Sequence, residues 1–153
     1  MKTMDIKIMS MLMLNARASW SQLAAKVGMS GPAIADRVHR LEEKGVIKGY
    51  TTLIDPKSVG YEMTAFITLS VNKNIHRAEF LAHVEKLPEI QECHHIAGED
   101  DYMLKVRCKD TRDLDRMISQ ELRELPGIDK TRTMIVLNSH KDTPIIPMPA
   151  EEE

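Results

Sequence analysis

The 153-residue sequence predicts an α+β protein in which a helix-turn-helix domain precedes a domain made of two β-α-β halves. Three observations support this prediction. Two capped helical segments joined by a glycine turn lie within residues 19–45, a strand–helix–strand pattern recurs within residues 61–140, and Pro and Gly interrupt the chain at 55–60. The predicted organisation is a helix-turn-helix domain over 1–50, a linker over 51–60, a second domain over 61–140 and a flexible tail over 141–153.

Residues 4–14 are predicted to form a first helix that is apolar on almost every side. Such a helix is buried on more than one side, and in so small a domain the second side can face another subunit. We expect Met9, Leu12 and, from the following helix, Trp20 to lie in the core.

Two further helices follow, each with a recognisable start. Ser19 and Gln22 have the spacing of a capping box, and Gly28 ends this second helix with a residue that tolerates the left-handed conformation. Ser30 is the next N-cap, and Pro32 stands in the first turn of the third helix, where its missing N–H costs little. The two helices and their turn therefore have the layout of a helix-turn-helix.

The third helix has one apolar and one polar face. Ile34, Val38 and Leu41 have the spacing of a buried face. The opposite stripe is therefore predicted to be exposed, and it consists of Ala33, Asp36, Arg37 and Arg40.

This exposed stripe has the chemistry to contact double-stranded DNA. The second helix of a helix-turn-helix enters the major groove, where arginine reaches guanine edges or phosphates, and its small N-terminal residues allow close approach of the free N–H groups to a phosphate. Residues 1–50 contain eight Lys or Arg against four Asp or Glu, although the whole chain has a formal net charge of −2. The candidate DNA-binding residues are Ser30, Gly31, Pro32, Ala33, Asp36, Arg37, Arg40 and Lys48. The alternative is that the arginines are solvated surface charges paired with Asp36 or Glu43.

Residues 46–54 are interpreted either as a short hairpin, which would make the domain a winged helix-turn-helix, or as an extended linker. Beyond the linker, apolar residues alternate from Met63 to Val71 and predict a strand. The predicted order continues with a helix over 74–87, strands over 90–97 and 102–109, a helix over 111–125 and a strand over 130–138. Both helices end in Leu-Pro-x-Ile, so the second domain is predicted to be a ferredoxin-like βαββαβ sandwich.

Short motifs in both domains resemble the Lrp/AsnC family of transcriptional regulators. They are Leu23-Ala24, Val27-Gly28-Met29-Ser30, residues 37–42, 45–50, 90–94 and 98–105, and Leu125-Pro126-Gly127-Ile128 leading to Thr131-Arg132-Thr133. The resemblance spans about residues 4–140. It implies a sequence-specific DNA-binding regulator whose second domains pack their sheets back to back into homodimers, with dimers assembling into octamers or similar rings and an amino-acid effector bound between dimers.

The resemblance centres the effector site on the loop between the second and third strands of the sheet domain. Gly98 permits close backbone approach, and Glu99 and Asp101 are suited to receive an ammonium group. The implied site residues are His95, Gly98, Glu99, Asp100, Asp101, Arg123 and Thr133. The family often has Asp at position 99 and an aromatic residue at position 100, so the run of three acids favours a basic ligand, or a polar hairpin loop with no ligand.

Other classes of function receive less support. No Ser/His/Asp or Cys/His pair and no phosphate-binding glycine loop is recognisable, so we expect no enzyme activity and no cofactor. Adjacent His94 and His95 point to opposite faces of a strand, which argues against a metal site. Two cysteines without a CxxC spacing, no apolar run of membrane-spanning length and no convincing signal peptide predict a cytoplasmic protein. An architectural DNA-wrapping protein with little sequence specificity and an amino-acid-binding metabolic module remain alternatives.

Overall fold

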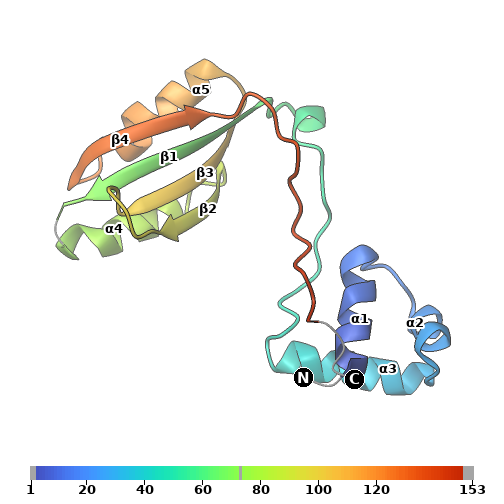
Figure 1. Ribbon diagram of the computed structural model, residues 1–153. Helices are drawn as coiled ribbons and strands as arrows, with labels where there is room; N and C mark the ends of the chain where they lie inside the picture. The colour runs from blue at the N-terminus through green and yellow to red at the C-terminus, as the bar shows by residue number, and fades with distance from the viewer. Residues whose placement is uncertain (1–2, 73, 150–153) are drawn as a thin grey trace. The chain divides into compact units, whose positions relative to one another are not determined.

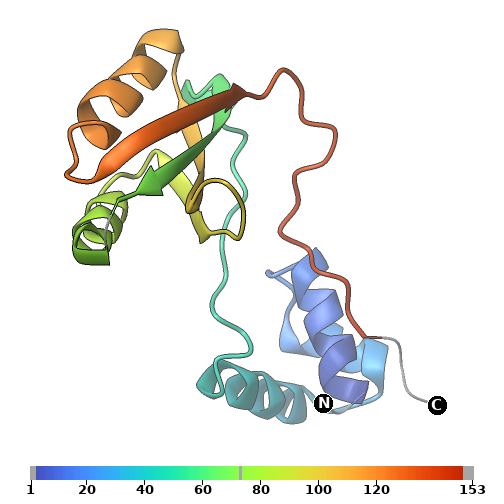
Figure 2. The same ribbon diagram turned by 60° about the vertical axis from the view of Figure 1, so that its left-hand side comes forward.

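The computed structural model describes residues 3–72 and 74–149, which form two compact units (Figures 1 and 2). One unit spans Ile54–His140, and the other contains the chain up to Leu53 together with the segment from Lys141 onward. Residues 141–149 contain no helix or strand, and the end of the predicted tail, residues 150–153, lies outside the described residues.

The N-terminal unit contains the three predicted helices, α1 (Thr3–Leu14), α2 (Trp20–Val27) and α3 (Gly31–Glu43). The capping box is confirmed, because the Gln22 N–H donates to Ser19 Oγ at 3.2 Å and the Ser19 N–H donates to Gln22 Oε1 at 2.8 Å. Gly28 has φ of 69°, the left-handed conformation predicted for the end of α2. These local signals fix the turn from which α3 starts.

The core of this unit draws on all three helices and consists of Ile8, Leu12, Leu23, Ala24, Ile34 and Val38. Met9 and Leu12 are buried as predicted, whereas the prediction for Trp20 is wrong, because its side chain is exposed. Trp20 is the first residue of α2, and the core contacts of that helix come from Leu23 and Ala24, one turn later.

The wing of the predicted winged helix-turn-helix is absent from the described chain, since residues 44–62 contain only a 3₁₀ turn, η1 (Lys57–Val59). The N–H groups of Val46 and Ile47 both donate to the Leu41 carbonyl, so the chain first closes the end of α3 instead of starting a strand. It then continues without regular structure, as in the linker interpretation.

The second unit is a four-stranded antiparallel sheet with helices on one face (Figure 1). Its elements are β1 (Met63–Val71), α4 (Asn74–Val84), β2 (Ile90–His95), β3 (Tyr102–Cys108), α5 (Thr111–Arg116), η2 (Met117–Leu122) and β4 (Ile128–Ile135). The strand order β2-β3-β1-β4 brings the two β-α-β halves together with their first strands adjacent, as in the predicted ferredoxin-like fold.

The alternation along β1 separates the two faces of the sheet. Ala65, Ile67 and Leu69 are completely buried in the core beneath the helices, together with Phe80 of α4. Phe66 points to the opposite face, because successive side chains alternate and its register partners there are Lys105 and Met134.

The last predicted helix is not a regular α-helix over 111–125. It changes after Arg116 into the π-helix η2, in which the Arg123 N–H donates to the Ile118 carbonyl at 2.9 Å, five residues back. Met117 and Leu122, also five residues apart, are both completely buried. The wider turn therefore directs both side chains into the core.

No helix within residues 3–72 or 74–149 is both long enough and apolar enough to span a bilayer.

Candidate nucleic-acid interface and effector site

The N-terminal half of α3 presents the predicted DNA-binding residues in different environments. Ser30 caps the helix by accepting from the Ala33 N–H at 3.4 Å, and Gly31 and Ala33 are half-buried beside the exposed Pro32. Pro32 has no N–H and the Ala33 N–H is bound to Ser30, so among the first three residues of α3 only Gly31 offers an N–H to a phosphate, and no bulky side chain shields it.

Arg40 lies on the exposed face predicted from the sequence. Its Nη1 is 3.6 Å from Asp36 Oδ2, and the two side chains are 55% and 74% exposed. An exposed pair of this kind contributes about 0–1 kcal/mol. Arg40 can therefore exchange Asp36 for a base edge or phosphate at little cost.

Arg37 is not free on that face, contrary to the prediction. Its Nη1 donates to Asp5 Oδ1 of α1 at 2.7 Å, and the two side chains are only 23% and 18% exposed. The side chain therefore ties α3 to α1. The sequence pattern missed this role because Asp5 lies 32 residues earlier and no local spacing links the two.

The segment after α3 is held by a contact with the C-terminal end of that helix. The Tyr50 hydroxyl donates to Glu42 Oε1 at 2.8 Å. Burial, helped by this hydrogen bond and by the charge of Glu42, raises the pKa of Tyr50 to about 12, so the hydroxyl remains a donor at neutral pH. Lys48, between these residues, is exposed and available to a nucleic-acid backbone.

In the second unit, the loop between β2 and β3 is held against β1 by its own acids. Asp100 is 6% exposed and accepts from Thr68 Oγ1 at 2.6 Å. Asp101 Oδ2 accepts from the Val71 N–H at 2.8 Å, and the Asp101 N–H donates to the Leu69 carbonyl at 3.0 Å. Asp100 and Asp101 therefore organise the loop, a role that the effector prediction did not anticipate.

Glu99 and Gly98 form the open part of this loop. The Glu99 side chain is 83% exposed, and its Oε2 lies 3.3 Å from Arg132 Nη2 of β4. A side chain built on Gly98 would meet no atom within 4 Å. A ligand can therefore approach the backbone here. Arg132, which also lies 3.8 Å from Asp100, was not among the predicted residues.

The remaining predicted effector residues are not gathered on the loop within one chain. The His95 ring lies 5.1 Å, centroid to centroid, from the ring of Tyr102. Arg123 Nε donates to Thr131 Oγ1 at 3.1 Å, and Thr133 pairs with Ile67 in the sheet. Strand pairing places Thr131 and Thr133 on the helix-covered face and Arg132 on the other.

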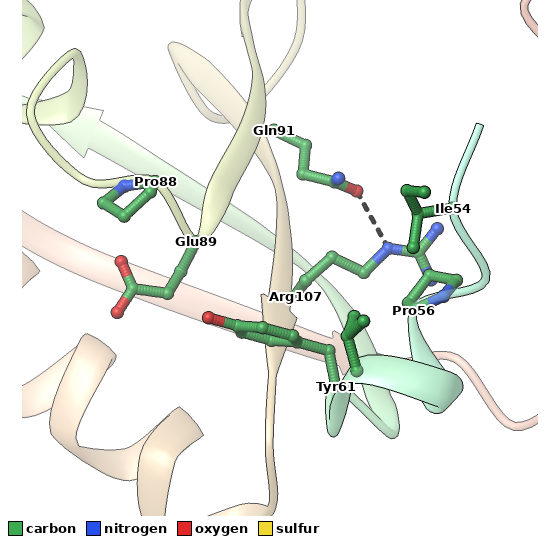
Figure 3. Close-up of a pocket in the computed structure, with 8 residues that line it drawn as sticks. Ile54, Pro56, Tyr61, Pro88, Glu89, Gln91 and Arg107 are labelled. Carbon is green, nitrogen blue, oxygen red and sulfur yellow. Dashed lines mark hydrogen bonds between the residues drawn. The ribbon is translucent and has the colours of Figure 1, made fainter. Parts of the chain in front are cut away.

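A separate hollow of about 220 Å³ lies at the start of β2 (Figure 3). Arg107 enters it with Nε donating to Gln91 Oε1 at 2.8 Å. The hollow contains none of the predicted effector residues, and it is lined by Ile54, Pro56, Val59, Tyr61, Pro88, Glu89, Gln91 and Arg107.

The two cysteines, Cys93 and Cys108, are not paired in a disulfide. Burial raises the pKa of the Cys93 thiol and, with nearby carboxylates, that of Cys108 to about 11, which disfavours the thiolate form. Within the described ranges, no three His, Cys, Asp or Glu side chains come close enough together to hold a metal ion.

Two family profiles match the chain and together cover almost all of it. Residues 1–48 match the profile described as a winged helix-turn-helix DNA-binding domain, and residues 64–146 match the Lrp/AsnC ligand binding domain. The first match lies within the N-terminal unit, and the second covers most of the sheet unit and extends to residue 146.

Relatives and solved structures agree with these profiles over nearly the whole length. The leucine-responsive regulatory protein of Haemophilus influenzae is 39% identical over 141 residues, covering 91% of this chain and 85% of its own. A transcriptional regulator of Neisseria meningitidis, solved with L-methionine, has a TM-score of 0.92 at 30% identity and 96% coverage of both chains. A feast or famine regulatory protein of M. tuberculosis, also with L-methionine, has a TM-score of 0.88 at 32% identity, covering 95% of this chain and 97% of its own.

Proposed function

The chain belongs to the Lrp/AsnC family of DNA-binding transcriptional regulators, and on this premise we propose that an amino acid bound at the β2–β3 loop modulates its binding to specific DNA sequences. Its relatives are regulators and not enzymes. The observation that carries the proposal is the capped helix-turn-helix that leaves Arg40 exposed on α3. No cofactor other than the effector is required.

The effector is proposed to be a small amino acid ligand such as L-methionine, which two structural neighbours contain. Glu99 supports this proposal because its carboxylate is almost fully exposed and can give up Arg132 for an ammonium group. Gly98 leaves the adjacent backbone open. Asp100 and Asp101 contribute by holding the loop in shape.

We further propose that the protein acts as homodimers that assemble into octamers or similar rings. The sheet face away from the helices presents Phe66 and Met134, which face each other across β1 and β4. Met134 is 44% exposed in the single chain. A second copy covering this face would bury these side chains, and its own α3, the recognition helix of its helix-turn-helix, would then read a second half-site.

The experiment is a DNA titration of the full-length protein at fixed salt, with and without L-methionine. A fragment from upstream of its own gene is compared with a scrambled fragment of equal composition. We expect tighter binding to the upstream fragment and a change of roughly 5- to 150-fold on adding the effector. Unchanged affinity across all proteinogenic amino acids would refute the effector proposal.

The same titration distinguishes the architectural alternative. A protein that wraps DNA through its backbone binds both fragments equally, because phosphate contacts carry no sequence information. Equal affinity at several salt concentrations would therefore replace sequence-specific regulation with DNA wrapping.

A further inference from the structure

The hollow at the start of β2 lies far from the loop proposed to bind the effector. Arg107 near the end of β3 lines the hollow, whereas Asp101 in the loop directly precedes the first residue of that strand. Six residues of extended chain separate the two, or about 20 Å at roughly 3.3 Å per residue. The hollow and the β2–β3 loop are therefore at opposite ends of the sheet, and one small ligand cannot reach both.

One wall of the hollow is the end of the linker, which forms a hydrogen-bonded turn. Asp55 Oδ2 accepts from the Ser58 N–H at 3.1 Å and from the Ser58 hydroxyl at 2.6 Å. The side chains of Ile54 and Val59 line the hollow from this wall and are 60% and 58% exposed. The linker therefore presents apolar surface that a ligand in the hollow would cover.

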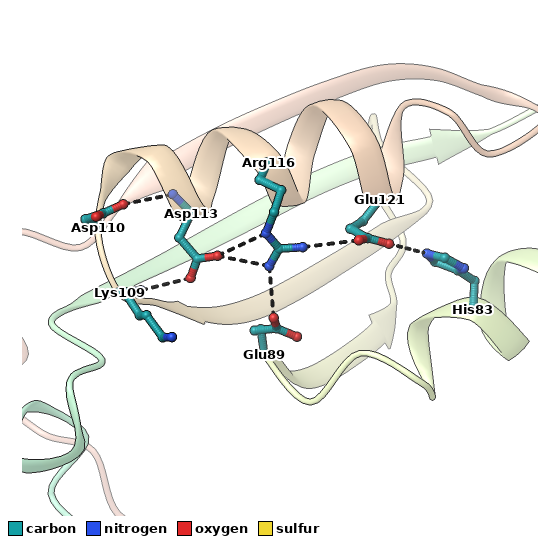
Figure 4. Close-up of polar contacts among 7 residues, drawn as sticks. All are labelled: His83, Glu89, Lys109, Asp110, Asp113, Arg116 and Glu121. Carbon is teal, nitrogen blue, oxygen red and sulfur yellow. Dashed lines mark hydrogen bonds and ion pairs between the residues drawn. The ribbon is translucent and has the colours of Figure 1, made fainter.

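The side toward the sheet carries two charged residues, Glu89 and Arg107 (Figure 3). Glu89 Oε1 accepts from Arg116 Nη2 of α5 at 2.9 Å, and the Glu89 side chain is only 18% exposed (Figure 4). Arg107 donates to two neutral oxygens, Gln91 Oε1 at 2.8 Å and Thr64 Oγ1 at 2.6 Å. A carboxylate that replaces the exposed Gln91 amide would form a stronger, charge-assisted hydrogen bond.

We propose that this hollow is a second ligand site, distinct from the proposed amino-acid site, and that it binds a small aliphatic carboxylate without an ammonium group. Arg107 binds the carboxylate, and Ile54 and Val59 cover the aliphatic chain. An ammonium group is disfavoured because Glu89, which could receive it, is already bound to Arg116. The volume of about 220 Å³ is smaller than the about 300–1,000 Å³ of pockets for drug-sized ligands, so the ligand is a small metabolite.

The test is calorimetry on the full-length protein with 4-methylpentanoate and 4-methylpentanamide. The two probes share one aliphatic skeleton and differ in the carboxylate, and neither has the ammonium group expected at Glu99. We expect the wild type to bind the acid at least about tenfold more tightly than the amide, and Arg107→Met to abolish this preference by weakening the acid alone. Val59→Trp, which fills the hollow from an exposed position, is expected to weaken both probes.

Hydrogen–deuterium exchange then locates the bound probe. 4-Methylpentanoate is expected to slow exchange of the backbone amides of residues 57–61, because the ligand holds the linker turn against the sheet. Exchange in the β2–β3 loop, residues 96–101, is expected to stay the same. Slowing confined to residues 96–101 would place the ligand in the amino-acid site and overturn the proposal.

Arg112→Met is the matched control, because it removes the same charge from an exposed position on α5. An equal loss of acid binding in Arg112→Met and Arg107→Met would show a nonspecific effect of charge and overturn the proposal. Equal binding of acid and amide by the wild type, or binding of neither, overturns it even if Arg107→Met fails to fold. All these outcomes leave the amino-acid site at the β2–β3 loop standing.

Discussion

Arg37 and Arg40 lie three residues apart on α3, yet their environments assign them different tasks. Arg37 is half-buried against Asp5 of α1, whereas Arg40 has only the weak exposed contact with Asp36. The first pair resembles a structural tie between helices. The second leaves a long, charged side chain whose release costs little.

Arg40→Ala is therefore expected to weaken binding to the upstream DNA fragment by about 1–3 kcal/mol, or roughly 5- to 150-fold, with an unchanged melting temperature.

Arg37→Ala leaves the half-buried Asp5 without its partner, so it is expected to lower the free energy of unfolding by about 1–3 kcal/mol. Titration at fixed salt and thermal denaturation of both variants measure these effects. An unaltered DNA affinity for Arg40→Ala would contradict its role in recognition.

At the scale of an element, Asp113 joins the start of α5 to the preceding strand. Its carboxylate accepts from the Lys109 N–H at 3.0 Å and from Arg116 Nη2 at 2.9 Å, which places it in the network of Figure 4. The Lys109 N–H, followed by Arg116, lowers the pKa of Asp113. A carboxylate whose pKa is lower in the folded protein stabilises the fold at pH values above its unfolded pKa of about 3.9. This contribution is lost as the pH falls through the folded pKa.

Asp113→Asn is expected to reduce the free energy of unfolding by about 1–3 kcal/mol at pH 7, and the difference from wild type should shrink as pH falls below about 4. Denaturant unfolding across this pH range measures it. Asp129→Asn, at an exposed position of β4, is the control for loss of one charge. A difference that stays constant down to pH 2 would show that the Asp113 charge is unimportant.

Features whose pattern is local, such as helix caps and the alternation of the strands, were predicted well from the sequence, whereas side-chain roles that depend on one distant partner were not. Ser19, Gln22 and Gly28 act on backbone groups within a few residues, so their pattern identifies the boundaries of α2. The buried position of Asp100 depends on Thr68, 32 residues earlier. In the sequence, Asp100 could be recognised only as one member of an acidic loop. The π-helix likewise depends on the core around Met117 and Leu122, which no propensity describes.

At the scale of the whole molecule, the proposed homodimer depends on the bare face of the sheet. Phe66 lies between Lys105 and Met134 on that face, away from the helices. In a homodimer related by a twofold axis the same patch meets itself, so a charge introduced there faces an identical charge. In the proposed dimer the two α3 helices bind two half-sites, so loss of pairing is expected to remove much of the DNA affinity.

Phe66→Asp is accordingly expected to convert the protein to monomers in sedimentation velocity and to weaken binding to the upstream fragment by at least about 100-fold. Thr111→Asp introduces the same charge in the exposed first turn of α5, where a carboxylate favours the helix, and it should alter neither property. Circular dichroism separates dissociation from unfolding. If Phe66→Asp keeps the wild-type sedimentation coefficient and remains folded, the bare face of the sheet is not a dimer interface, and the proposal that it brings two α3 helices onto two half-sites is wrong.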